Sequence, residues 1–170
     1  MSNGALIRRA VLSDATRISE LTQTIQALHA QAMPDVFKPA TAQSFSEHLV
    51  CQLLAQPASV FLVAADGDDV VGHLYAEVQH VAASSIKYAT TRMLVHQAVV
   101  DVAWQRRGIG HRLLQQVRQI AEAEHIPALV IDVWDFNQTA HDFYRKHGFR
   151  DTRHAMSLSL SPLGAPRSEV

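Results

Sequence analysis

Short apolar runs alternate with segments of helical periodicity along the chain, which is the pattern of a sheet covered by helices. Residues 5–10 predict a first strand. Ser13 or Asp14 can then cap a helix, and the apolar positions that recur along it at helical spacing are Ile18, Leu21, Ile25 and Leu28. A loop bracketed by prolines follows, and a second helix is predicted over about 41–55.

The middle of the chain predicts a hairpin of two strands. Residues 59–65 form a nearly continuous apolar run, and residues 66–69 supply a turn in which Gly67 can adopt a positive φ. Residues 70–81 then alternate, with one face made of Gly72, Leu74, Ala76 and Val78 and the other of His73, Tyr75, Glu77 and Gln79. Such alternation predicts that the first face packs in the core and the second faces solvent or a cleft.

The second half predicts a strand–helix–strand crossover. Residues 92–102 form the first strand pattern, residues 108–124 an amphipathic helix that stops before Pro127, and residues 128–134 a buried strand. A right-handed crossover with parallel strands is expected. A short helix over 137–148 and a closing strand over 149–160 follow, and we expect residues 161–170 to form a flexible tail. The predicted order is β-α-α-β-β-β-α-β-α-β, an α/β fold with a mixed sheet in one domain over residues 1–170.

Composition narrows the function by exclusion. The 170 residues carry a net charge of −1 and no long run of one sign, which disfavours a general nucleic-acid or membrane-surface binder. The single cysteine, Cys51, cannot form an internal disulfide, so we expect a cytoplasmic protein, and its apolar surroundings predict an inert core thiol. No apolar stretch approaches a membrane span, and the first residues lack the apolar segment of a signal peptide. The ten histidines show no metal-ligand spacing, so no metal is expected.

The segment Gln105-Arg106-Arg107-Gly108-Ile109-Gly110 stands where the strand pattern gives way to the helix pattern. A helix that begins at Gly108 leaves its first backbone N–H groups without helical partners, at the positive end of its dipole. Glycine lets a bulky anion approach these groups, and the two arginines add positive charge. The segment predicts either a phosphate or pyrophosphate seat or a tight turn with a solvated rim. A P-loop and a dinucleotide fingerprint fit badly, because the lysine of the first and the third glycine of the second are missing.

Two segments, taken together, resemble the signatures of the GNAT acyl-CoA N-acyltransferases. The turn Gln105–Gly110 matches the family pattern Q/R-x-x-G-x-G/A. The segment NQTAHDFYRKHGF matches N-x-x-A-x-x-F-Y-x-x-x-G-F at Asn137, Ala140, Phe143, Tyr144, Gly148 and Phe149. The match is close over residues 92–150. It departs from the family at Val102-Ala103-Trp104, where many members carry a proline and an acidic residue before the aromatic.

The resemblance implies the GNAT fold, with acetyl-CoA as co-substrate. In that family the strand before the turn carries a bulge and separates from the next strand, and the pantetheine arm pairs with the exposed edge. It implies that the backbone of Val100 and Val102 holds the pantetheine and acetyl group, and that the N–H groups of residues 106–111 hold the pyrophosphate. The implied cofactor-binding residues are Val100, Val102, Gln105, Arg106, Arg107, Gly108, Ile109, Gly110, His111, Asn137 and Tyr144. For Asn137, a plain helix cap is the alternative.

Acetyl transfer to an amine places three demands on the protein. By resemblance, the backbone N–H of Val100 would stabilise the developing oxyanion. Tyr144 would act as general acid for the leaving thiolate, since a tyrosine pKa near ~10 lies close to a thiol's ~8.5; the alternative is a core aromatic with its hydroxyl at the surface. Glu77 is the first candidate for the base that takes the amine proton, against a solvated carboxylate or a contact to substrate charge. The weaker candidates for the base are His80, His96 and Asp132.

The acceptor is left open by the sequence. A protein N-terminus or lysine, a polyamine, an aminoglycoside and an amino acid all remain, and Asp35 and Glu77 could attract a cationic amine. Family members often form homodimers, but no segment identifies a dimer surface. The rival classes are a catalytically silent acyl-CoA-binding or regulatory module of the same fold and a nucleotide-binding domain of another kind. Tyr144 favours the enzyme, because a silent copy has no need of the acid.

Overall fold

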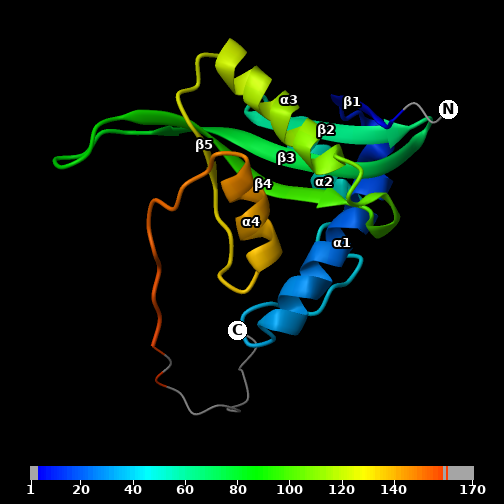
Figure 1. The fold of residues 1–170 in the computed structure, drawn as a ribbon, viewed down its shortest axis with the longest axis horizontal. Coiled ribbons are helices and arrows are strands. Elements are labelled where there is room, and N and C mark those ends of the chain that lie inside the picture. Colours follow the sequence, from blue (N-terminus) through cyan, green and yellow to red (C-terminus); the bar gives the residue numbers. More distant parts are fainter. Residues whose placement is uncertain (1–3, 159, 161–170) are drawn as a thin grey trace. The chain divides into compact units, whose positions relative to one another are not determined.

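A single mixed sheet forms the centre of the fold in the computed structural model, which describes residues 4–158 and 160 (Figure 1). Its strand order is β1-β2-β3-β4-β5, where neighbours are antiparallel except for the parallel pair β4 and β5. The strands of the described residues are β1 Leu6–Arg9, β2 Ser59–Asp66, β3 Asp69–Val81, β4 Thr90–Val100 and β5 Leu129–Ile131. The helices are α1 Ala15–Ala32, α2 Glu47–Leu54, α3 Ile109–Ala123 and α4 Gln138–Lys146, with 3₁₀ turns at Leu12–Asp14 and Val102–Trp104.

The chain divides into two compact units, Met1–Asp132 and Val133–Val170. The first contains the whole sheet with α1, α2 and α3, and the second contains α4. The two strands of the predicted crossover, β4 and β5, pair in parallel through Met93–Val95 and Leu129–Ile131, and α3 lies between them in the sequence. The mixed α/β fold predicted from the apolar pattern is therefore confirmed.

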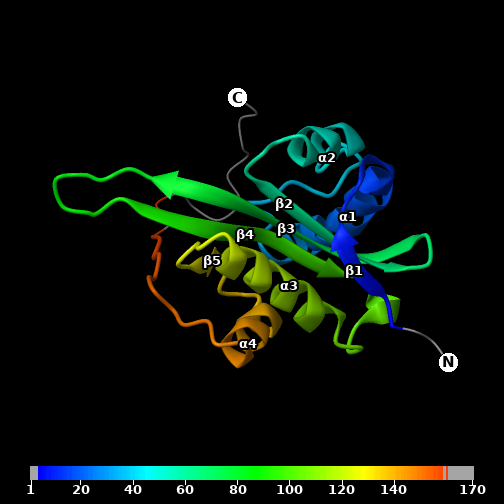
Figure 2. The same cartoon turned by 90° about the horizontal axis from the view of Figure 1, so that it is seen from above.

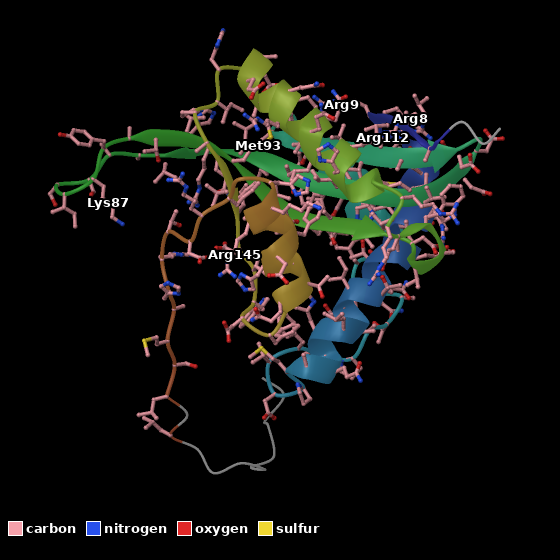
Figure 3. The ribbon with its side chains drawn as sticks, viewed as in Figure 1. Arg8, Arg9, Lys87, Met93, Arg112 and Arg145 are labelled. Carbon is pink, nitrogen blue, oxygen red and sulfur yellow. The ribbon has the colours of Figure 1, made fainter. Side chains whose placement is uncertain are left out.

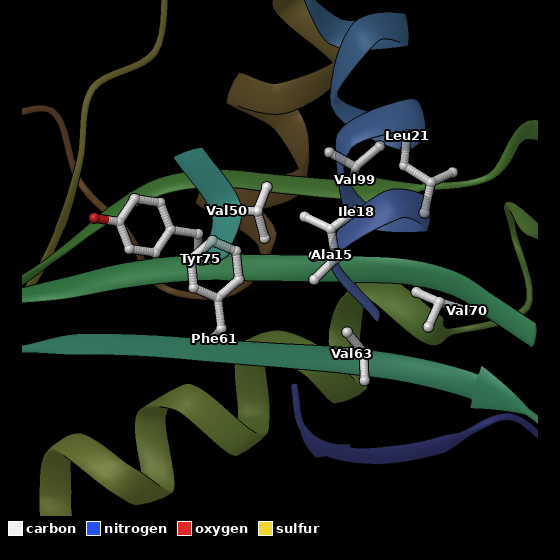
Figure 4. Close-up of a cluster of buried hydrophobic side chains, with 9 residues drawn as sticks. All are labelled: Ala15, Ile18, Leu21, Val50, Phe61, Val63, Val70, Tyr75 and Val99. Atoms are coloured by element: carbon white, nitrogen blue, oxygen red, sulfur yellow. The ribbon is translucent and has the colours of Figure 1, made fainter. Parts of the chain in front are cut away.

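The sheet of the first unit is covered on both faces. On one face, α1 and α2 bury a cluster with the strands, whose members are Ala15, Ile18, Leu21, Val50, Phe61, Val63, Val70, Tyr75 and Val99 (Figure 4). Successive strand residues point to opposite faces, so the fully buried Leu62 and Leu74 belong to the other face, which α3 covers. Figure 2 shows α2 and α3 on opposite sides of the sheet. Burial of this extent on two faces supplies the apolar driving force of the fold.

The central strand β3 departs from its predicted two-faced pattern. His73 is fully buried, although the alternation predicts that it faces solvent or a cleft, and Tyr75 is 7 % exposed but lines a pocket. The reason is that α1 covers this part of the sheet, with Thr22 of α1 3.3 Å from the Nε2 of His73. The prediction holds at Tyr75, which borders this pocket, and further along the strand, where Glu77 and Gln79 are partly exposed. In Figure 3, Met93 lies on β4, where this strand pairs with β5, and Lys87 lies in the β3–β4 hairpin.

Several element bounds differ from prediction. The second helix begins only at Glu47, because the Ser46 side chain caps it by accepting from the Leu49 N–H at 3.2 Å. Strand β4 runs from Thr90 to Val100, so it begins and ends two residues earlier than predicted, and β5 spans only three residues and is shorter than predicted. The predicted closing strand over 149–160 is wrong for the described residues 149–158 and 160, which form no strand. The predicted tail over 161–170 lies outside the described residues.

The hairpin between β2 and β3 turns as predicted, with Gly67 at φ +61°. Within the described part of the chain, no helix combines the length and apolar character needed to cross a membrane.

Candidate active site

Strand β4 carries a bulge at His96. The register passes from Tyr75↔Gln97 to Ala76↔Val95, so two residues of β4 stand opposite one step of β3. An inserted residue of this kind reverses which edge the following backbone groups face. The bulge that the resemblance implied is present, and it lies in the middle of the strand.

Beyond the bulge, β4 presents an edge that β5 does not pair. Pairing between the two strands stops at Val95↔Ile131, five residues before β4 ends. The N–H of Asp101 donates to the Val71 carbonyl of β3 at 2.9 Å. In an antiparallel pair every second residue points its N–H and C=O groups toward the partner strand. Ala98 and Val100 therefore direct their N–H groups away from β3, toward the side on which β5 has ended. The predicted role of Val100 has the backbone direction that it requires.

The residues after β4 turn sharply and are anchored to α1. Asp101 accepts from the N–H of Ala103 at 3.0 Å and from the Nη2 of Arg17 at 2.6 Å. Arg17 also donates to the carbonyl of Val70 at 3.2 Å, so one guanidinium ties the end of β4 to the adjoining strand. Val102 opens the 3₁₀ turn and is 77 % exposed. Val102 thus lies outside the strand, and the second β4 residue whose N–H points to the same edge as that of Val100 is Ala98.

The glycine turn has the conformation that an anion seat requires. Gly108 adopts φ +77° immediately before α3, and no side chain caps the helix there. The first helical hydrogen bond is donated by the Arg112 N–H to the Gly108 carbonyl at 3.1 Å. N–H groups that precede this bond point outward along the positive end of the helix dipole. The first turn of α3 contains no acidic residue, so nothing in it opposes an anion.

Side chains around the turn support its shape. Gln105 donates from its Nε2 to the Val100 carbonyl at 3.1 Å, which closes the turn onto the end of β4. Arg106 adopts φ +61°, an uncommon conformation for a residue with a Cβ. The guanidinium of Arg107 lies 4.7 Å from the centre of the Trp104 ring, in a cation–π contact. The buried side chain of Ile109 anchors the start of α3 in the core, and the exposed side chains of Arg106 and Arg107 place positive charge beside it.

The second signature segment lies in the other unit and is built around α4. Asn137 caps the helix, with its Oδ1 accepting from the Ala140 N–H at 3.1 Å. Gly148 adopts φ +89° after the helix, and the Phe149 N–H returns to the Tyr144 carbonyl at 3.1 Å. The ring of Tyr144 lies edge-on between Phe143 and Phe149, at 5.1 and 5.3 Å between ring centres. The helix-cap role weighed for Asn137 is present in the structure.

Burial changes the acid chemistry of Tyr144. It raises the pKa of the Tyr144 hydroxyl to about 12. The hydroxyl therefore keeps its proton throughout the neutral range, but it is a poor match for a thiol of pKa ~8.5. Full transfer of the proton to a thiolate would be uphill by about 5 kcal/mol. Tyr144 is thus better suited to donate a hydrogen bond to a leaving sulfur than to give up its proton completely.

Glu77 is paired with the bulged residue of the neighbouring strand. Its Oε2 lies 3.2 Å from the Nε2 of His96 and also accepts from the Gln79 amide at 3.3 Å. The Glu77 and His96 side chains are 29 % and 35 % exposed, so both remain accessible. An imidazole whose Nε2–H donates to this carboxylate keeps its Nδ1 as a proton acceptor. Of the weaker candidates, His96 is the one that the structure joins to Glu77.

The other two base candidates have different surroundings. The Nδ1 of His80 is 3.0 Å from the hydroxyl of Thr91 on the exposed side of the hairpin. Asp132 follows the last residue of β5 and is exposed. No group of three or more potential metal ligands occurs among the residues that the structure describes. The Glu77–His96 pair is therefore the acid–base arrangement best placed in the first unit.

A pocket of about 280 Å³ opens beside the bulge. It is bounded by α1, by the loop between α1 and α2, and by β3 and β4, and its lining includes His29, Phe37, Phe45, Tyr75 and His96. His96 thus belongs both to the pocket and to the pair with Glu77. The sequence pattern did not single out Phe37, Phe45 or Ala98. For Ala98, counting back along the strand by two from Val100 would have sufficed.

Comparison with known proteins places this geometry in a family. A model of the acetyltransferase (GNAT) family matches residues 22–149, which include both signature segments. The BH1408 protein of Bacillus halodurans, solved as a tetramutant, superposes with a TM-score of 0.86 at 20 % identity, over 91 % of this chain and 99 % of that one.

Two further solved structures show the same fold. An aminoglycoside acetyltransferase from an uncultured soil metagenomic sample, in complex with sisomicin, gives a TM-score of 0.64 at 22 % identity over 94 % of this chain and 97 % of that one. An acetyltransferase of Trypanosoma brucei gives 0.67 at 18 % identity, over 91 % and 99 % of the two chains. The chain belongs to the GNAT acetyltransferase family.

Proposed function

We propose that this protein transfers an acetyl group from acetyl-CoA to a primary amine. The observation that carries the proposal is the edge of β4 at Ala98 and Val100, which β5 leaves unpaired and which leads into the uncapped start of α3 at Gly108. An extended arm with amide groups can pair with such an edge as an added strand. A pyrophosphate at the far end of that arm then meets the helix N-terminus.

The residues present fit acetyl-CoA in charge and shape. Ala98 and Val100 would hold the pantetheine amides, and the N–H groups of residues 106–111 the pyrophosphate. Arg106 and Arg107 supply positive charge at the rim, and Gly108 keeps the approach open because its position has no Cβ. The side chain of Gln105 holds the turn in shape through its hydrogen bond to the Val100 carbonyl. Val102 would contact acetyl-CoA from the 3₁₀ turn rather than from the strand. Asn137 is already a helix cap, so its amide nitrogen would be the group that contacts the cofactor.

Acetyl-CoA, when bound, supplies an activated thioester carbonyl, and the chain supplies the groups around it. The N–H of Val100 would donate to the carbonyl oxygen as negative charge develops there. The new N–C bond forms while the C–S bond breaks. Tyr144 would donate a hydrogen bond to the departing sulfur, a role consistent with a pKa raised by burial to about 12.

The amine must lose a proton in the same reaction, because a protonated amine has no lone pair. We infer that the proton passes to the Nδ1 of His96, whose Nε2 is 3.2 Å from the Glu77 carboxylate. Glu77 would hold the ring in one tautomer and stabilise the imidazolium. In this arrangement Glu77 acts through His96, and the predicted role of Glu77 as the base becomes a positioning role.

Two measurements on the full chain test the proposal. Calorimetric titration with acetyl-CoA should show saturable binding, and a panel of amines should release free thiol, detected with a chromogenic disulfide. Acetyl-CoA binding without thiol release on any amine would favour the silent acyl-CoA-binding module instead. Absence of acetyl-CoA binding would rule out both the acetyltransferase and the silent acyl-CoA-binding module. We also propose that residues 1–170 form one N-acetyltransferase domain, because the family resemblance includes both signature segments.

A further inference from the structure

We propose that the acceptor is a small monoamine in which a short chain joins the amine to one aromatic ring. The inference rests on the proposed function, because it names the amine that enters the pocket beside His96. The pocket of about 280 Å³ lies just below the usual range of small-molecule sites, about 300–1,000 Å³. Its size suits one ring and a short chain.

Ring side chains converge on this pocket from four separate parts of the first unit. His29 comes from α1, Phe37 and Phe45 from the loop after it, Tyr75 from β3 and His96 from β4. Aromatic partners stack or meet edge-on with a gain beyond the area that they bury. A pocket with walls of this kind favours a flat apolar body over a hydrophilic one.

Two of these rings, Tyr75 and His96, form a nearly parallel series with Phe61 of the core. Phe61 and Tyr75 lie 4.4 Å apart with planes 9° from parallel, and Tyr75 and His96 lie 4.7 Å apart at 15°. Phe61 and Tyr75 are buried in the core cluster, so the orientation of the His96 ring is set from inside the protein. The proton acceptor and an aromatic surface are therefore held in one rigid piece.

Charge separates a monoamine from a polycation. Among the described residues that line the pocket, none is acidic, and none is lysine or arginine. Ammonium groups taken out of water need carboxylate partners. Glu77 stands behind His96 as a single carboxylate, which matches a single amine nitrogen. Polyamines and aminoglycosides carry several ammonium groups and would leave the others unpaired.

The loop wall of the pocket is already formed. The Gln26 amide of α1 donates to the Lys38 carbonyl at 2.7 Å, and the His29 and Phe37 rings lie 4.8 Å apart. The N–H of Phe37 also returns to the Met33 carbonyl at 3.0 Å. A wall held by these contacts needs little ordering when a ligand binds, so its shape can select the ligand.

The test uses the full chain and a thiol-release assay with acetyl-CoA. The amines are 2-phenylethylamine, butylamine, spermidine and sisomicin. We expect kcat/KM for 2-phenylethylamine to exceed that for butylamine by about tenfold or more, as one aromatic contact would give, with spermidine and sisomicin poorer still. Thiol release that is fastest with spermidine, sisomicin or butylamine would overturn the monoamine inference and leave the proposed acetyl transfer intact.

A pair of variants tests whether the aromatic wall of the pocket binds the amine. Phe37→Ala should raise KM for 2-phenylethylamine by about tenfold while KM for acetyl-CoA stays the same. Val36→Ala is the matched control, since Val36 is the exposed neighbour of Phe37 and does not line the pocket. Equal effects of the two variants would overturn the inference.

A direct measurement of amine binding distinguishes a failure of the proposed function from a failure of the proposed amine site. If no amine releases thiol, the proposed function fails, and calorimetric titration of 2-phenylethylamine still decides the pocket. Binding that Phe37→Ala weakens and Val36→Ala leaves unchanged would support the aromatic site. No binding to the wild-type chain would overturn it.

Discussion

The Nε2 of His96 lies 3.2 Å from the Oε2 of Glu77, and the two residues come from adjacent strands, 19 positions apart. The pairing depends on the bulge, because the ladder passes from Tyr75↔Gln97 to Ala76↔Val95 around His96. His96 therefore stands outside the regular register, next to a carboxylate and inside the pocket wall. The carboxylate of Glu77 and the imidazole of His96 can therefore act together as an acid–base pair.

If the pair acts as a unit, its two members should not contribute independently. We expect His96→Gln to lower kcat by about 10²-fold, in the range of general acid–base catalysis. Glu77→Gln should lower kcat as well, and the double variant should be hardly worse than His96→Gln alone. Steady-state kinetics at saturating acetyl-CoA measure this. His80→Gln is the control, since His80 contacts Thr91 and should leave kcat unchanged. Strictly multiplicative losses in the double variant would contradict the pairing.

The turn at Gly108 should be sensitive to a single methyl group. Gly108→Ala places a Cβ at φ +77°, which costs about 1–2 kcal/mol in backbone conformation, although no atom lies within 4 Å of that Cβ. We expect the Kd for acetyl-CoA to rise by about tenfold, because the helix start shifts. Gly67→Ala is a matched control, with φ +61° and equally open surroundings in the β2–β3 turn. The two variants should lose similar stability in chemical denaturation, and equal acetyl-CoA affinity in both would refute the seat.

Removal of the Tyr144 hydroxyl should act at every accessible pH. Burial raises the Tyr144 pKa to about 12, so the hydroxyl is protonated across the range in which the enzyme can be assayed. Tyr144→Phe should therefore lower kcat by a constant factor of about 10–100 between pH 6 and pH 10. KM for acetyl-CoA should change little. Tyr88→Phe serves as control, because Tyr88 is 93 % exposed in the β3–β4 hairpin. Unchanged turnover in Tyr144→Phe would exclude a role for the hydroxyl.

His73 should make the protein sensitive to acid. Burial lowers its pKa to about 3 from the ordinary value of 6.5. The unfolded state therefore binds the proton more readily, and the resulting stability is complete above pH ~6.5 and declines as the pH falls toward ~3. At pH ~5 the loss due to His73 should be about 2 kcal/mol.

Chemical denaturation at pH ~7.5 and pH ~5 checks this expectation. His73→Gln should show a smaller difference in unfolding free energy between the two conditions than the wild type, by about 2 kcal/mol. His48→Gln, at an exposed position of α2, should behave like the wild type. The same pH difference in His73→Gln as in the wild type would show that His73 is not the cause.

Local chemistry in the sequence was enough to place many elements. The hairpin turn at Gly67, the helix start at Gly108 and the Asn137 cap all formed where single residues demanded them. Glycine at positive φ and a side chain that accepts from a helix N–H are local effects, which the neighbouring residues decide. Two spaced signatures were also sufficient to indicate the family.

Only the tertiary structure decided what the polar positions of β3 do. His73 and Tyr75 alternate with apolar residues, yet α1 covers both, because a helix distant in the sequence packs on that face. The closing strand did not form in the described residues, since a strand needs a partner as well as a pattern. The bulge at His96 is likewise a product of pairing between strands.

By itself the sequence determined the mixed α/β fold, the family signatures and the turn at Gly108, because these depend on periodicity and on the conformational freedom of single residues. The tertiary structure decided that β4 has an unpaired edge at Ala98 and Val100, that Glu77 meets His96, and that aromatic rings surround the pocket. Those features depend on which strands pair, in which register, and on where α1 and its loop pack, and such long-range contacts leave no periodic trace in the chain.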